Sequence, residues 1–165
     1  MRIAVRLRAV TMAVWSVVAL ASPSSADIKA YNEAVTKGDF AAGATEAAAT
    51  WPMLDKARPD IVTIGQEFAW TAMRAKKPEI ASAILGSLKE GKVADSKPEL
   101  TAVLLAWASF TAKPDDRSRK ALLDALEARA AAGSAENISI RAGQELFLYE
   151  WEHDEFDDAA RTAAN

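Results

Sequence analysis

The sequence predicts an all-α protein built from antiparallel helical hairpins, and three observations lead to this prediction. Alanine, the residue with the highest helix propensity, makes up about a fifth of the chain after residue 26. No stretch shows the sustained alternation of apolar β-branched and polar residues that marks a half-buried strand. The five prolines after residue 26 fall between periodic apolar stretches or in a first helical turn, where a missing N–H is tolerated; they are Pro52, Pro59, Pro78, Pro98 and Pro114.

Residues 1–26 have the three parts of a signal peptide. A basic start without acidic residues precedes an apolar run of about 13 residues, fewer than the roughly 20 that span a membrane. Small residues then occupy the −3 and −1 positions of a cleavage site, Ser24 and Ala26. We therefore expect cleavage after Ala26 and one domain over 27–165. The alanine-rich composition indicates the periplasm of a Gram-negative bacterium, without stable membrane insertion after cleavage.

The composition excludes several classes of protein. Residues after position 26 include 17 basic and 23 acidic side chains, a net charge of −6, and the basic ones form no cluster. Such a chain is a poor candidate for binding nucleic acid or anionic membranes. Because the chain has no cysteine, disulfides, thiolate nucleophiles and cysteine zinc sites are excluded as well.

Proline positions and apolar periodicity together predict eight helices after the signal peptide. Asp60 is placed to cap the third helix, and Asp115 and Asp116 put negative charge at the start of the sixth. Gly91 and Gly133 follow the ends of the fourth and sixth helices. The predicted helices cover residues 28–37, 40–51, 60–76, 79–90, 98–113, 116–132, 137–153 and 156–164.

Each of the four central helices carries one apolar stripe, at spacings of three and four residues, that is expected to face the core. The stripes are Ile61, Ile64, Phe68 and Ala72; Ile80, Ala83, Ile84 and Leu88; Leu100, Val103, Leu104 and Trp107; and Leu122, Ala125, Leu126 and Ala130.

The helices also come in pairs at a repeating distance. Short turns at Gly38-Asp39, Lys77-Pro78, Pro114-Asp115 and His153-Asp154 follow one another at intervals of about 39, 37 and 39 residues. A unit of two helices with this period is typical of an α-solenoid, in which each hairpin buries its face on its neighbours. The sequence thus predicts a short solenoid of about four hairpins. An irregular helical bundle with accidental spacing is the alternative.

Recurring small and aromatic residues define a second pattern within the pairs. The turns Asp39-Phe40 and Glu155-Phe156 also share a local motif. On these motifs the chain resembles the tetratricopeptide-repeat family over nearly all of residues 27–165, although two first helices are about one turn longer than the family's. The resemblance implies protein or peptide binding on a concave face. The recurring columns are Gly65, Ala102 and Gly143, followed three positions later by Phe68, Leu105 and Leu146, and five positions later by Trp70, Trp107 and Leu148.

Catalytic and metal-binding motifs are scarce. Glu150 and His153 form an E-x-x-H pair, which is half of the ligand set of a carboxylate di-metal bundle. A second pair cannot exist, because His153 is the one histidine of the sequence. We interpret this charged segment as a solvated helix end. No nucleophile elbow and no glycine-rich phosphate loop is present, so the sequence predicts no catalytic, cofactor-binding or metal-binding residue.

Three residues are candidates for partner binding. Trp107 lies on a clear apolar stripe and is expected in the core, but Trp70 lies beside its stripe and Trp151 lies next to charged residues. These two tryptophans could form an aromatic groove for a peptide or glycan. Glu67, close to Trp70, is either a solvent-facing contact residue or the acid of a glycan-cleaving enzyme.

The predicted function is therefore a non-enzymatic periplasmic interaction module or scaffold that binds a protein or peptide partner. One alternative is a small helical hydrolase of cell-envelope polymers. Another comes from the order of signal peptide and helical repeats, which is similar to the N-terminal part of certain TonB-type energy transducers.

Overall fold

The computed structural model describes residues 25–132, 137–153 and 155–164, and this part of the chain is helical without strands. The eight α-helices match the predicted ones in order and closely in their ends, which confirms the all-α prediction. They are α1 (Ser25–Thr36), α2 (Phe40–Thr50), α3 (Ile61–Arg74), α4 (Pro78–Glu90), α5 (Pro98–Ala112), α6 (Asp116–Ala131), α7 (Asn137–Glu152) and α8 (Phe156–Ala163), with the short 3₁₀ helix η1 (Trp51–Met53) after α2.

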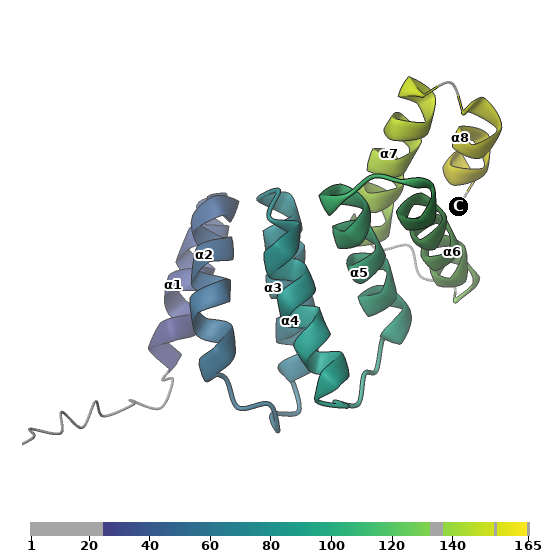
Figure 1. Cartoon of the computed structure of the whole chain (residues 1–165). Helices are drawn as coiled ribbons and strands as arrows, with labels where there is room; N and C mark the ends of the chain where they lie inside the picture. The colour runs from purple at the N-terminus through teal and green to yellow at the C-terminus, as the bar shows by residue number, and fades with distance from the viewer. Residues whose placement is uncertain (1–24, 133–136, 154, 165) are drawn as a thin grey trace, which may run out of the picture.

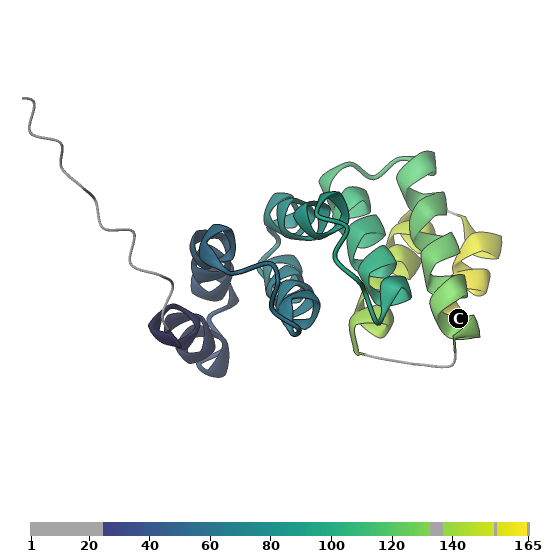
Figure 2. The ribbon, with the colours of Figure 1, turned by 90° about the horizontal axis from the view of Figure 1, so that it is seen from below.

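The helices pack as four hairpins, α1–α2, α3–α4, α5–α6 and α7–α8 (Figure 1). Each hairpin contacts the next through α2 and α3, α4 and α5, and α6 and α7. The first helices α3, α5 and α7 also contact one another in chain order, so the hairpins succeed each other in space as they do in sequence (Figure 2). This arrangement agrees with the predicted pairing of helices. The resemblance to tetratricopeptide repeats remains a prediction.

Capping at the starts of α2 and α6 follows the sequence pattern. Gly38 adopts a left-handed φ of 76°, and Asp39 then accepts a hydrogen bond from the Ala42 N–H at 2.9 Å. At α6, Asp115 accepts from the Ser118 N–H at 2.8 Å while the Ser118 hydroxyl accepts from the Asp115 N–H at 3.0 Å. This reciprocal pair satisfies two N–H groups that have no partner within the helix.

One predicted helix-end role is not observed. Asp60 precedes α3, but its carboxylate accepts hydrogen bonds from Arg58 Nε at 2.9 Å and Nη2 at 2.7 Å instead of capping the helix. Gly91 directly follows the end of α4, as predicted; its φ is −71°, and the left-handed residue is Lys92, with a φ of 50°. Gly133 lies outside the described residues.

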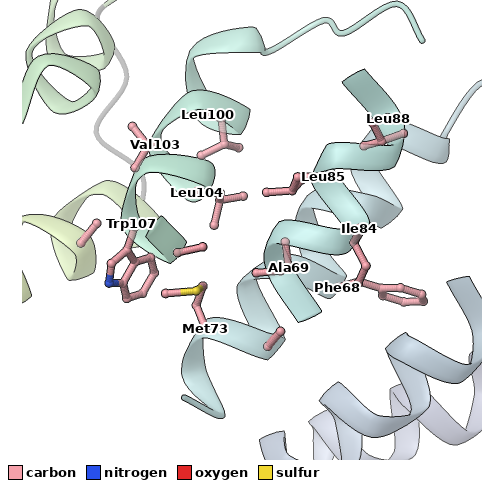
Figure 3. Packing of buried hydrophobic residues seen from close by; sticks show 14 of the residues in the cluster. Phe68, Ala69, Met73, Ile84, Leu85, Leu88, Leu100, Val103, Leu104 and Trp107 are labelled. Atoms are coloured by element: carbon pink, nitrogen blue, oxygen red, sulfur yellow. The ribbon is translucent and has the colours of Figure 1, made fainter. Parts of the chain in front are cut away.

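The core runs between the hairpins, and the stripe of α5 is its central part (Figure 3). All four stripe residues of α5 are buried. The stripe assignments of Ala83 in α4 and Ala130 in α6 are wrong, because both residues are exposed, whereas Ala81 and Leu85 are buried on α4. An alanine side chain is small enough for either side of a helix, so it says little about which side faces the core.

At Gly65 of α3, side chains of both α4 and η1 pack closely against the helix. A Cβ at this position would lie 2.8 Å from Leu88 Cδ1 and 3.0 Å from the Trp51 ring. The other two members of the predicted small-residue column differ, since Ala102 is exposed and a Cβ on Gly143 would only reach ordinary contact, at 3.9 Å. The column therefore marks close packing only at its first position.

Helix α8 is tied to α6 and α7 by polar contacts. Arg119 of α6 pairs with Glu155 and, at 2.6 Å, with Asp158. Arg161 Nη2 lies 2.9 Å from Glu127 Oε1, and Thr162 Oγ1 donates to Glu150 Oε2 at 2.7 Å. The last hairpin thus folds back over the side of the third one.

Candidate functional site

An apolar groove with a volume of about 750 Å³ opens between α6, α7 and α8. This volume lies in the range of ligand-binding pockets, about 300–1,000 Å³. Apolar side chains from all three helices line it: Leu126 and Ala130 from α6, Ile140, Phe147 and Leu148 from α7, and Ala163 from α8.

Helix α7 is apolar on two opposite sides, and this explains the groove. One side packs into the core through the buried residues Ala142 and Leu146. The opposite side carries a second stripe, which we call the outer stripe, and its residues are spaced to share one helix face. The outer stripe consists of Ile140, Phe147, Leu148 and Trp151.

The outer stripe is unusually open to solvent. Ile140 is 51% exposed, Leu148 55% and Trp151 56%, and among the described residues only Met53 joins them as an exposed large hydrophobic residue. The Trp151 ring stacks on Phe147 with 6.0 Å between the ring centroids, so it extends the apolar surface beyond the groove itself. Large exposed apolar side chains gathered on one helix face mark an interaction site more often than isolated ones do.

Arg141 is the cationic side chain that the groove presents to solvent. Arg129 also lines the groove, but it is buried and its Nη1 lies 2.8 Å from Glu99 Oε1, so its charge is compensated. Glu145, the one carboxylate among the described lining residues, accepts hydrogen bonds from Lys76 Nζ at 2.7 Å and Trp107 Nε1 at 2.8 Å. Arg141 is 56% exposed and lies 3.9 Å from Glu145, so its guanidinium can reach an incoming carboxylate.

The structure separates the three predicted partner-binding residues. Trp151 is exposed on α7 and borders the groove through Phe147. Trp70 on α3 is half-buried, with its ring centroid 5.7 Å from that of Trp107, and Glu67 is exposed one helical turn away. No contact among the described residues joins Trp70 with Trp151, and neither Trp70 nor Glu67 lines the groove.

Ile140, Phe147 and Leu148 are residues of the groove that the sequence analysis missed. The sequence pattern places Leu148 in a recurring packing column and does not predict the outer stripe. The signal was present in the sequence, because α7 has apolar residues on both helix faces, and a helix that is apolar on both faces needs a partner for each.

The E-x-x-H pair on α7 is split by the fold. The His153 ring is exposed and stacks on Tyr149 at 4.0 Å, as expected for a solvated helix end. Glu150 is fully buried, so its assignment to a solvated surface is wrong; α8 folds over it and supplies the Thr162 hydroxyl. No group of three or more His, Asp and Glu side chains in the described part of the chain could hold a metal ion.

Burial raises the pKa of Glu150, and the nearby carboxylates of Asp158 and Glu155 add to this, while Thr162 and Arg119 oppose it. Its Oε1 atom has no hydrogen-bond partner among the described atoms. A raised pKa in the folded state means that protonated Glu150 favours folding. This contribution is complete below the pKa of the unfolded chain and is lost as the pH rises through the folded-state pKa.

We therefore expect Glu150→Gln to be more stable than the native chain at pH 7, with a difference that shrinks as the pH falls through the raised pKa of Glu150 and is small at pH 4, below the usual glutamate pKa. Urea denaturation at both pH values measures this difference. Glu152→Gln removes one charge at an exposed position of the same helix and is the matched control. A stabilisation by Glu150→Gln that grows toward low pH would show that Arg119 holds Glu150 as an ion.

The described helices include none that is long and apolar enough to cross a membrane. Comparison with family models, curated proteins and solved structures finds no match for the chain, so the groove is interpreted from its own residues.

Proposed function

We propose that this protein is a non-enzymatic interaction module of the periplasm that binds a protein or peptide partner in the groove between α6, α7 and α8. The observation that carries the proposal is the outer stripe of α7, which leaves three large apolar side chains more than half exposed. Covering such a surface with a partner gains roughly 25 cal/mol for each Å² of apolar area removed from water.

The groups that line the groove support binding more than catalysis. Ser139 is a lining hydroxyl, but its Oγ has no hydrogen-bond partner in the described part of the chain and therefore no adjacent base. A nucleophilic serine needs a base within hydrogen-bond reach. The histidine that could serve as one, His153, is stacked on Tyr149. The alternative of an envelope-polymer hydrolase based on Glu67 has no support from the groove, which Glu67 does not line.

Localisation and repeat family are parts of the same proposal. The signal-peptide pattern of residues 1–26 supports the periplasm. The packing of four hairpins in chain order supports a short solenoid that resembles tetratricopeptide repeats.

Site-specific cross-linking tests the proposed function. A photoreactive amino acid at position 148 should give one defined protein adduct in cells, and the same amino acid at Ala48, an exposed position of α2, should not give it. The cross-linked protein, identified by mass and purified, should bind the Leu148→Asp variant at least tenfold more weakly, a loss of about 1.4 kcal/mol. Leu148 is exposed, so this variant should melt at the native temperature.

Two outcomes would contradict the groove as the binding site. The first is an equal yield of the adduct from both positions. The second is unchanged affinity of Leu148→Asp for the purified partner, combined with weaker binding by Trp70→Ala, which would place the interaction on α3.

A further inference from the structure

The length of the outer stripe limits what can occupy the groove. From Ile140 to Trp151 the stripe extends over eleven residue steps of α7. At 1.5 Å per residue this distance is about 16 Å, or three helical turns. A second helix of three turns placed along α7 would contact the stripe over its whole length, with apolar side chains at i, i+3 or i+4, and i+7.

The walls of the groove favour a helical occupant over an extended one. All three walls are α-helices, and the described part of the chain has no sheet edge to which a strand could add. An extended segment would find few partners for its N–H and C=O groups, because the groove is mostly apolar and its described neutral polar lining is limited to Ser139, Gln144 and Thr162. A helix satisfies these groups within itself, so it can cover the same apolar surface without that loss.

Charge restricts the occupant further. Arg141, the exposed cation of the groove, lies 3.9 Å from Glu145, and that carboxylate already accepts hydrogen bonds from Lys76 and Trp107. An occupant with acidic side chains beside its apolar stripe complements this charge. A second copy of the chain docked through α7 would instead bring Arg141 of both copies to the same interface, because a two-fold interface repeats each residue.

From these three observations we infer that the groove binds an acidic amphipathic α-helix of about three turns, laid along the outer stripe of α7 with a carboxylate close to Arg141. This inference rests on the proposed function and names the chemistry of the partner segment.

Synthetic peptides test the inference on the whole mature chain. The first probe is a 14-residue capped peptide with leucines at positions 2, 5, 9 and 12 and glutamates on both flanks of the leucine stripe. A second probe has lysines in place of the glutamates, and a third keeps the glutamates but has a central proline that breaks the helix. Fluorescence anisotropy should show the first peptide binding at least tenfold more tightly than either of the others.

Protein variants test the two contacts separately. Leu148→Asp should abolish binding of the acidic peptide, and Arg141→Glu should reverse the preference so that the lysine peptide binds more tightly. Arg117→Glu makes the same charge change at an exposed position of α6 outside the groove and should leave the affinities unchanged.

Several results would overturn the inference. Equal affinity of the proline peptide would mean that the occupant is not helical, and equal affinity of the lysine peptide would mean that the charges do not select it. Saturable binding of dodecanoate, with no binding of any peptide, would identify a lipid site instead. The acidic peptide could fail to displace the cross-linked partner although Leu148→Asp still weakens binding of that partner. In this case the proposed function stands and only the helical occupant is wrong.

Discussion

Replacing Trp107 with alanine is expected to lower the free energy of unfolding by about 3–5 kcal/mol. The Trp107 side chain is 1% exposed and lies in the central stripe of α5 (Figure 3). Its ring packs on Trp70, and its Nε1 donates to Glu145 of α7 at 2.8 Å. The substitution therefore leaves a cavity and removes a hydrogen bond between the third and fourth hairpins. A small domain has about 5–15 kcal/mol in total, so the variant should melt much lower or fail to accumulate.

Trp70→Ala is the comparison within the same aromatic pair. Trp70 is only half-buried, so its loss removes less apolar contact and should cost clearly less than the loss of Trp107. Urea denaturation of the two purified variants measures both costs. An equal cost for the two substitutions would mean that Trp70 is as much a core residue as Trp107 and cannot be an exposed contact for a partner.

Gly65→Val is expected to destabilise the fold by about 3 kcal/mol, at the upper end of what overpacking a core commonly costs. Even a single Cβ here would lie 2.8 Å from Leu88 Cδ1 and 3.0 Å from the Trp51 ring. The Trp51 ring has little freedom to move, because its Nε1 donates to Ser87 Oγ at 2.8 Å and the Lys56 ammonium lies 3.8 Å above it.

Gly86→Val is the matched control for Gly65→Val. Gly86 lies within α4, and a Cβ there would meet nothing within 4 Å. Because both substitutions replace glycine with valine inside a helix, the difference between their effects isolates the packing at Gly65. Thermal melts of the two variants measure this difference. Similar melting temperatures would show that η1 and α4 can move away from α3 without loss of stability.

The helices could be predicted because their signals are local. Prolines, capping residues and apolar spacing act within a few residues, and the bounds of all eight helices follow from them. The same locality explains the failed cap at Asp60. Arg58, two residues earlier, donates two hydrogen bonds to this carboxylate, and the capping pattern does not include such a competing donor.

The groove could not be predicted in the same way, because it depends on how the last hairpin meets α6. The apolar residues Ile140 and Leu148 are visible in the sequence, but which side of α7 is covered depends on packing between elements. Glu150 shows the converse case. Charged and polar residues follow it in the sequence at positions 152–155, yet α8 returns over it and buries it completely. Both outcomes follow from contacts between hairpins rather than from local sequence.

The Glu145 carboxylate has a consequence for the folding of the array. It joins Lys76, in the turn of the second hairpin, to Trp107 of the third hairpin, while Glu145 itself belongs to the fourth. A linear array in which each unit touches only its neighbours can lose its ends one at a time. The Glu145 carboxylate adds a contact that skips over a unit, so the second and fourth hairpins are coupled through it as well as through the third. Loss of this carboxylate should therefore be felt in the second and third hairpins, and not in the fourth hairpin alone.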